Sequence, residues 1–456
     1  MKTLSNQATI WVLFLFFFSS AFAASSEGCK GTVQPPDALF YPNKLENTTI
    51  TSLPKWAIDM MTERKETLEK MYYSDFPPGY TSPWGSYIYF GGAGTALLFL
   101  RFYHLEMETL QNGNGYYQGS MERATNYLEI SKDYIDNALP NTLWEDEHIG
   151  FLKGRTGSLA LASVIYSLSG DDTTAKEYIA EAATHYDSVS VDSPFDLDSG
   201  MAGMLYTARY LKKFYGKDMI EQSRVDNVAS TLYQLGLKYY NTTIKALQFG
   251  PAFNGMHRIG EGLFGSGGVI YQLLQEDWLL NNPQALADVK STIDYYLSTQ
   301  KPDGQIYDDF HDAGKRIQWC HGIPGLIPIF LKAYEVFGEE KYLDAAKLGS
   351  DLVAQKGVLV KGMMLCHGVI GNVYQLFDLY AKTKDETYRS KAYSMVLTAL
   401  QNPLLTDPTK WISYDCLASS FFVSTAGGML SFFSDMLAHT NELEKLSMPA
   451  FGDQWW

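Results

Sequence analysis

The chain repeats one short pattern along most of its length: Gly-x-x-Gly, followed at once by a long apolar run. The pattern begins at Gly91, Gly154, Gly200, Gly265, Gly322 and Gly368, and a degenerate seventh copy runs from Ser424 to Gly427. The spacing varies from 46 residues (Gly154 to Gly200) to 65 residues (Gly200 to Gly265). Such a period is typical of a fold built from stacked copies of one supersecondary unit.

Each copy predicts a unit of two helices. A run that is apolar on nearly every side suits a buried inner helix, whereas Ala175 to Tyr186 and Glu340 to Leu352 place their charges on one face, as outer helices do. The paired glycines let neighbouring backbones approach closely and allow a positive φ where the buried helix begins. The sequence therefore predicts an all-α protein with few and short strands.

Composition disfavours several classes of partner. Of the 456 residues, 46% are hydrophobic and 19% are charged, which is enough apolar material for a large core. The formal net charge is −15 and no basic run occurs, so a phosphate-rich partner is disfavoured. We therefore expect neither nucleic acid nor an anionic membrane surface as a partner.

Residues 1–24 are predicted to be a secretory signal peptide. Lys2 supplies a positive start, Ile10 to Phe18 is apolar, and Ala-Phe-Ala at 21–23 has the pattern of a signal-peptidase site. The alternative is an uncleaved anchor, but the apolar run is short for a membrane span of about 20 residues. We expect a cleaved chain without a stable membrane anchor, secreted or held in the lumen of the endoplasmic reticulum.

The rest of the chain divides into two parts. Residues 25–80 are predicted to form a proline-containing arm and a helix from Trp56 to Met71, and residues 81–456 to form the repeat domain. Asn-x-Thr sequons at Asn47 and Asn241 fit a glycosylated chain of the secretory pathway.

Two copies of the repeat contain residues suited to chemistry. The first reads Gln-Trp-Cys-His-Gly-Ile-Pro-Gly-Leu at 318–326, and the second reads Leu-Cys-His-Gly-Val-Ile-Gly-Asn at 365–372. Thiolates and imidazoles at matching places of one repeat are typical of a metal site, and a catalytic Zn²⁺ keeps three protein ligands and an open fourth position. Cys320, Cys366 and His367 would supply those three ligands.

Two alternatives to a metal site stay open at this point. Free cysteines are often small buried hydrophobic residues, and in an oxidising compartment Cys320 and Cys366 could form a disulfide. The other two cysteines, Cys29 and Cys416, could pair there as well, although four cysteines are too few for a disulfide-stapled scaffold of this length.

Together these motifs resemble the lanthionine synthetase C-like (LanC-like) family, in its eukaryotic branch. The resemblance covers about residues 40–451 and rests on both Cys-His-Gly segments, on Phe-Leu-Lys-Gly-Arg-Thr-Gly-Ser-Leu-Ala at 151–160, on the Gly-x-x-Gly series and on the closing Pro-Ala-Phe at 449–451. It implies an α/α toroid of seven inner and seven outer helices, with zinc held at one end by Cys320, Cys366 and His367.

The resemblance also implies an activity. Bacterial members cyclise lanthionine rings by adding a cysteine thiolate to a dehydrated Ser or Thr; eukaryotic members bind glutathione and are associated with its addition to dehydroalanine or dehydrobutyrine. A free thiol is mostly protonated at neutral pH, and zinc coordination deprotonates it. The addition also needs a proton at the α-carbon, which an imidazole can supply. His321 is the candidate, with the alternative that it only orients a ligand or packs against Trp319.

Two further positions match the family. Asp196, four residues before Gly200, could act as a base or orient an imidazole, and Lys361, five residues before Cys366, matches a basic residue associated with glutathione binding. The alternatives are a helix-capping role for Asp196 and a solvated loop position for Lys361.

Two departures from the family bear on turnover. Phe264 stands where the family usually has a histidine in the fourth repeat, with His257 as a substitute upstream, and Val423 replaces the glutamate of Phe-Glu-Gly in the last repeat. The main hypothesis is therefore a zinc-dependent protein that binds glutathione or a peptide thiol and adds it slowly to peptides containing dehydroamino acids.

Two other functions are retained as alternatives. One is a secreted binding protein on a catalytically retired scaffold, which Phe264 and Val423 favour. The other is an α/α toroid glycosidase, which needs two carboxylates flanking a sugar and would draw them from Asp308, Asp309 and Asp312.

Overall fold

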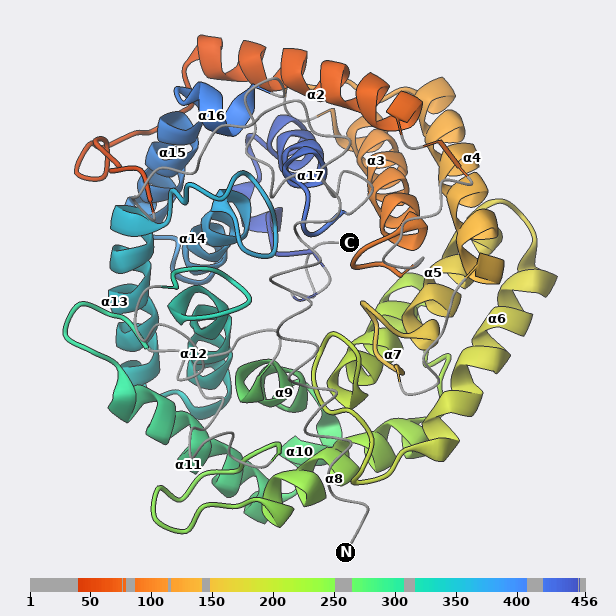
Figure 1. The fold of residues 1–456 in the computed structure, drawn as a ribbon, viewed down its shortest axis with the longest axis vertical. Coiled ribbons are helices and arrows are strands. Elements are labelled where there is room, and N and C mark those ends of the chain that lie inside the picture. Colours follow the sequence, from red (N-terminus) through yellow and green to blue (C-terminus); the bar gives the residue numbers. More distant parts are fainter. Residues whose placement is uncertain are drawn as a thin grey trace, which may run out of the picture.

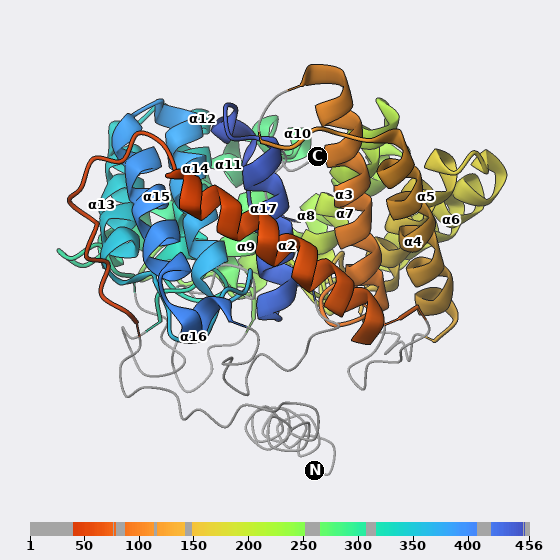
Figure 2. The same ribbon diagram turned by 90° about the horizontal axis from the view of Figure 1, so that it is seen from above.

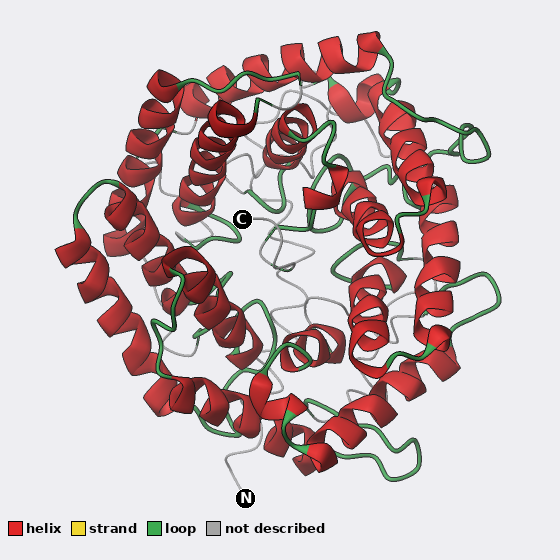
Figure 3. Cartoon of the chain, turned by 180° about the vertical axis from the view of Figure 1, so that it is seen from behind, coloured by secondary structure: helices red, strands yellow, loops and turns green. Residues whose placement is uncertain are grey.

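A computed structural model describes residues 40–75, 77–78, 87–113, 116–141, 148–250, 265–306, 316–407, 421–449 and 451. Within these ranges the chain is helical, and pairing between extended segments is limited to isolated bridges. Figure 3 shows helices without strands. The helices form two concentric rings, so the predicted α/α toroid is confirmed (Figure 1).

Each inner helix in the described part of the chain begins at a Gly-x-x-Gly turn or, for the last one, at the degenerate seventh copy. In the described ranges these helices are α3 (Gly92–Asn112), α5 (Arg155–Leu168), α7 (Met201–Tyr215), α9 (Ser266–Leu273), α12 (Ile323–Phe337), α14 (Val369–Thr383) and α17 (Thr425–Ala438). The residue before each helix is the first glycine of the pattern or, in the last copy, Ser424. The predicted position of each repeat is therefore confirmed.

The outer ring covers the inner one. In the same ranges it consists of α2 (Lys55–Asp75), α4 (Met121–Ala138), α6 (Asp172–Thr184), α8 (Gln222–Lys238), α11 (Pro283–Thr299), α13 (Glu340–Lys356) and α15 (Glu386–Leu400). The predicted helix near the N-terminus is α2, which packs against α17 and so lies in the ring (Figure 2). A domain division at residue 81 stays a prediction.

Short helices fill several connections: α10 (Asp277–Leu280), α16 (Pro403–Thr406), and the 3-10 segments η2 (Leu139–Asn141), η3 (His185–Ser188) and η6 (Leu443–Lys445). The core lies between the two rings and between adjacent inner helices. All residues of α17 are buried, as expected for a run that is apolar on every side. Among the described residues, no helix combines the length and apolar character that a membrane span requires.

Close backbone contact explains the second glycine of the pattern. A Cβ atom on Gly157 would lie 2.0 Å from the carbonyl oxygen of Phe151, and one on Gly371 would lie 1.9 Å from that of Leu365. The expected positive φ is found at only one of the glycines that precede the described inner helices, Gly322, where φ is 101°. The others are extended, so that part of the prediction is wrong: close approach, not a left-handed backbone, is the general reason for glycine.

Buried polar contacts close the ring where its first and last inner helices meet. Arg101 of α3 forms an ion pair with Asp435 of α17 at 2.9 Å, and the Tyr374 hydroxyl of α14 donates to the other Asp435 oxygen at 2.7 Å. Nearer the surface, Glu108 of α3 accepts from Lys445 at 2.6 Å and is 2.9 Å from His439. Ion pairs and hydrogen bonds, as well as apolar packing, therefore join the first inner helix to the last ones.

We expect Gly157→Ala to lower the free energy of unfolding by about 3 kcal/mol, because the added methyl group meets backbone that cannot move aside. The matched control is Gly92→Ala, also in the first turn of an inner helix, where the nearest atom to an added Cβ is 3.4 Å away. That change should be neutral or should stabilise by up to about 1 kcal/mol. Urea unfolding of both variants is the measurement, and equal stabilities would contradict the close-approach explanation.

Glu108→Gln should remove the acid sensitivity that the contacts between Glu108, His439 and Lys445 give to the free energy of unfolding. The hydrogen bond to His439 lowers the pKa of Glu108 from 4.5 to about 2, with Lys445 adding to the effect. A lowered carboxyl pKa stabilises the fold above pH 4.5, and this stabilisation is lost as the pH falls towards 2. We expect a loss of about 2 kcal/mol at pH 7 that shrinks below pH 4. Urea unfolding at pH 7 and 3 measures it, and the more exposed Glu444→Gln, with little effect at either pH, is the control.

Candidate metal centre

The two Cys-His-Gly segments lie in neighbouring turns of the inner ring. Cys320 and His321 directly precede Gly322, the cap of α12, and Cys366 and His367 stand at the same places before the cap of α14. Since α12 and α14 are adjacent, equivalent positions of two repeats become neighbours in space. Both cysteines are buried.

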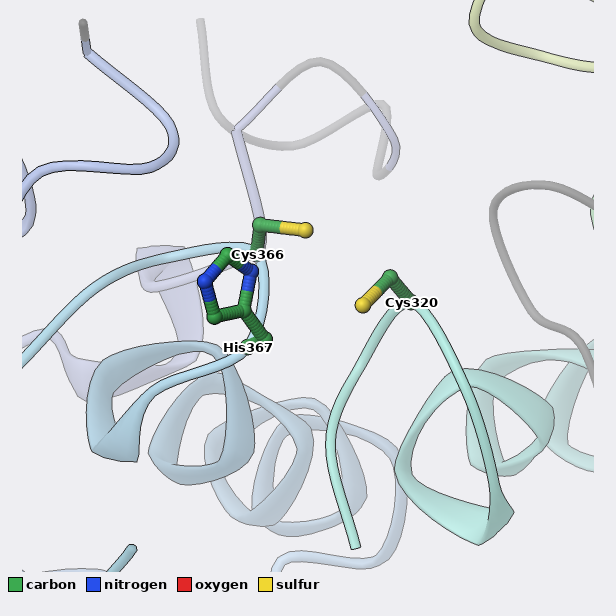
Figure 4. A group of neighbouring side chains, drawn as sticks. All are labelled: Cys320, Cys366 and His367. Carbon is green, nitrogen blue, oxygen red and sulfur yellow. The ribbon is translucent and has the colours of Figure 1, made fainter. Parts of the chain in front are cut away.

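The predicted ligand atoms converge. One ligand atom each of Cys320, Cys366 and His367 lies within 4.8 Å of the other two, and Figure 4 shows both sulfurs directed into the space between the turns. A tetrahedral Zn²⁺ with Zn–S bonds of about 2.3 Å holds its ligand atoms roughly 3.5–4 Å apart. The cluster therefore fits a metal ion after a small contraction, and the soft donor set suits zinc.

Backbone hydrogen bonds between turns fix this spacing. The N–H of Cys320 donates to the carbonyl of Cys366 at 3.2 Å, and the N–H of Cys366 donates to Phe422 in the next turn at 3.0 Å. The Asn372 side chain, fully buried in α14, donates to Ile317 at 2.8 Å and to Gly357 at 3.1 Å. The backbone of the two cysteines is thus fixed by main-chain hydrogen bonds between neighbouring turns.

Polar side chains contact both sulfurs. The Gln318 amide donates to Cys320 Sγ at 3.2 Å, and the Tyr89 hydroxyl is hydrogen-bonded to Cys366 Sγ at 2.8 Å. Burial raises the pKa of Cys320, but the Cys366 hydrogen bond and the adjacent imidazoles outweigh it and hold the pKa well below its usual range. Burial and the neighbouring Cys320 raise the pKa of Cys366. The pair therefore gives up its first proton readily and its second with difficulty.

Of the remaining predicted residues, His321 and Lys361 are linked to this centre, whereas Asp196 makes a local contact. His321 is half-buried and acts on Cys320 through its charge when it is protonated. Lys361 is exposed, and its ammonium donates to the Gln318 side chain at 2.9 Å, which links it to the Cys320 side of the centre. The Asp196 carboxylate accepts from the Ser199 N–H at 2.8 Å, a local contact typical of a capped turn. Catalytic roles for His321 and Asp196 stay predictions.

Sequence reasoning missed three residues of this site: Tyr89, Lys153 and Asp198. Tyr89 and Asp198 stand two residues before their inner-helix caps, the same place as both cysteines, and Lys153 stands one residue before, the same place as both histidines. The signal was therefore present in the repeat frame. Burial raises the pKa of Asp198 to about 6, although Lys153 acts in the opposite direction.

The seventh turn supplies apolar groups instead. Phe422 stacks on the Tyr89 ring with centroids 5.8 Å apart, and Val423 is 5% exposed. The other residues considered from sequence, Cys29, His257, Phe264, Asp308, Asp309, Asp312 and Cys416, lie outside the described residues.

An α/α toroid with a cluster of two cysteines and one histidine in the turns of its inner ring defines a narrow class of protein. Comparison with known families agrees: the chain belongs to the lanthionine synthetase C-like protein family, whose profile matches residues 82–406. The resemblance identified from the motifs is thereby confirmed.

Individual relatives are distant. The chain is 26% identical over 311 residues to the Danio rerio protein "Glutathione S-transferase LANCL1", covering 67% of this chain and 72% of the relative. It is 26% identical over 263 residues to the Arabidopsis thaliana "LanC-like protein GCL1", covering 55% and 60%. The solved structure "Nisin cyclase" superposes with a TM-score of 0.58 at 13% identity, covering 83% of this chain and 96% of that one, and it shares the fold.

Proposed function

We propose that this chain binds Zn²⁺ through Cys320, Cys366 and His367, binds a thiol such as glutathione, and adds that thiol to dehydroamino acids. The observation that supports the proposal most directly is the buried cluster of two sulfurs and one imidazole within 4.8 Å. The name of the Danio rerio relative, a glutathione S-transferase, supports the choice of thiol.

The chain's own residues have distinct tasks in this proposal. Zinc, when bound, would lower the pKa of a thiol ligand. Gln318 and Tyr89 hydrogen-bond to the two cysteine sulfurs and hold them in place. Lys361 offers a cation for a carboxylate of the thiol compound, and His321 delivers the proton that the α-carbon requires.

A second candidate function is a binding protein without turnover. Val423 places a buried apolar side chain where the family pattern has a glutamate. This alternative keeps the metal centre and the thiol but lacks the addition step. The glycosidase alternative gains no support, because its three aspartates lie outside the described residues and two thiols have no task in it.

We also propose that the protein works in the secretory pathway. Support comes from the signal-like pattern at 1–24 and from the two sequons. The Asn47 side chain is exposed, and Asn241 lies half-buried in a turn that it helps to form. Zinc coordination of Cys320 and Cys366 would protect them from oxidation in that compartment.

The zinc content tests the ligand set. We expect one zinc ion per purified chain and none in Cys366→Ala, because two remaining ligands hold zinc poorly. Cys416→Ala is the matched control and should keep its zinc. Atomic absorption measures the metal. A parent chain without zinc, in which mass mapping finds a Cys320–Cys366 disulfide, would show the ligand assignment to be wrong.

The rate of thiol addition tests the activity. We expect the parent chain to bind glutathione but to add it slowly to a dehydroalanine peptide, since loss of one acid-base group typically lowers a rate by about 10²- to 10⁴-fold. Phe264→His should raise the rate at least about tenfold without a change in zinc content. Mass spectrometry of the peptide follows the reaction. Glutathione binding without addition in both proteins would favour the binding-protein alternative.

A further inference from the structure

A charged pair lies beside the metal centre, on the Cys366 side. Lys153 precedes the cap of α5, and Asp198 lies two residues before the cap of α7. Their side chains form an ion pair, and the N–H of Lys153 also donates to the carbonyl of Asp198 at 2.8 Å. The Asp198 side chain is 3% exposed and the Lys153 side chain 18% exposed. The aspartate is thus buried, whereas solvent reaches the lysine.

Tyr89 connects this pair to the centre. The Lys153 ammonium lies 4.9 Å from the centroid of the Tyr89 ring and 5.0 Å from that of Phe90, and the Tyr89 hydroxyl is 2.8 Å from Cys366 Sγ. A cation over an aromatic face is held by the ring quadrupole. One side chain, Tyr89, therefore spans from the cation to a predicted zinc ligand. The negative charge of Asp198 also acts on Tyr89 and Cys366.

The pair differs from a structural ion pair. Burying two charges is costly unless their hydrogen-bonding capacity is used, yet Asp198 Oδ1 is buried and has no hydrogen-bond partner among the described residues. A buried carboxylate oxygen without a donor requires an explanation, such as a bound molecule.

We propose that Lys153, oriented by Asp198, binds the acyl oxygen of the dehydroamino acid acceptor and stabilises the negative charge that develops there during thiol addition. This inference rests on the proposed function. As the thiolate sulfur forms a bond to the β-carbon, the C=C π bond breaks and its electron pair moves onto the acyl oxygen as an enolate. A proton then adds at the α-carbon. The S–H and π bonds are exchanged for C–S and C–H bonds, and no oxidant or reductant is needed.

The two lysines of the site then have separate tasks. Lys361 reaches the Cys320 side through Gln318, and Lys153 reaches the Cys366 side through Tyr89. Addition brings together two reactants, a thiol compound with its own carboxylates and an acceptor with a developing oxyanion. A cation on each side of the centre matches this requirement. Preorganised charge at an oxyanion is among the largest contributions to catalysis.

The test compares the zinc-loaded full chain with Lys153→Met, Lys153→Arg and Asp198→Asn. Zinc content, glutathione affinity by calorimetry, melting temperature, and kcat and KM with a dehydroalanine peptide are measured for each. Lys153→Met should lower kcat about 10²- to 10³-fold, with zinc content unchanged and the glutathione Kd within about twofold. Lys153→Arg keeps the cation and should recover most of the rate. Asp198 is a positioning residue, and Asp198→Asn should lower kcat about tenfold.

The control is Lys212→Met, which removes a lysine paired with Asp218 on the exposed end of α7 and should leave every readout unchanged. If Lys153→Met weakens glutathione binding while kcat stays the same, Lys153 serves the thiol and the proposal is wrong. Equal losses in Lys153→Met and Lys153→Arg, with lowered melting temperatures, would assign the pair to stability. A parent chain that binds glutathione but shows no addition overturns the proposed activity and this inference together.

Discussion

The whole molecule depends on the close backbone packing at the turn that starts each inner helix. At the second glycine of a copy there is room for a hydrogen atom but not for a methyl group, because the carbonyl six residues earlier lies about 2 Å from the position of a Cβ in the Gly157 and Gly371 turns. In these turns the carbonyl six residues earlier therefore packs directly against the second glycine, at the start of the inner helix. Main-chain bonds between adjacent turns, such as Tyr89 to Leu152 and Cys366 to Phe422, then join the copies side by side.

That constraint also explains how a site arises in a repetitive fold. The two residues before each cap are presented at the same end of the inner ring, and their backbone is already fixed by the neighbouring copy. Substitution at these places changes the chemistry without changing the scaffold. Cysteine and histidine in two adjacent copies give a cluster that could hold a metal ion, tyrosine in the first copy gives a hydrogen bond to Cys366, and Lys153 with Asp198 gives an ion pair.

The sequence was informative where one local pattern determines the structure. Inner helices could be placed from Gly-x-x-Gly because the glycines are required by backbone contact. The grouping of Cys320, Cys366 and His367 could be predicted because Cys-His-Gly occurs twice in one frame. Tyr89, Lys153 and Asp198 were missed because none is an unusual residue by itself; their importance comes from distances across the ring. Among the glycines that precede the described inner helices, only Gly322 has the expected positive φ. The φ value of each glycine depends on the path of the chain in the turn before it, and the Gly-x-x-Gly motif does not fix that path.

Charge balance explains why lysines surround a centre in so acidic a chain. Two cysteine thiolates would offset the charge of a bound divalent ion, so beyond its own coordination shell the filled centre would attract anionic groups only weakly. The protein as a whole, with a net charge of −15, repels anions. Any attraction for the carboxylates of a thiol compound, or for an oxyanion formed during addition, must therefore come from nearby cations. In the proposed function Lys361, linked to Cys320 through Gln318, and Lys153, linked to Cys366 through Tyr89, meet this need, and Asp198 pairs with the second of them.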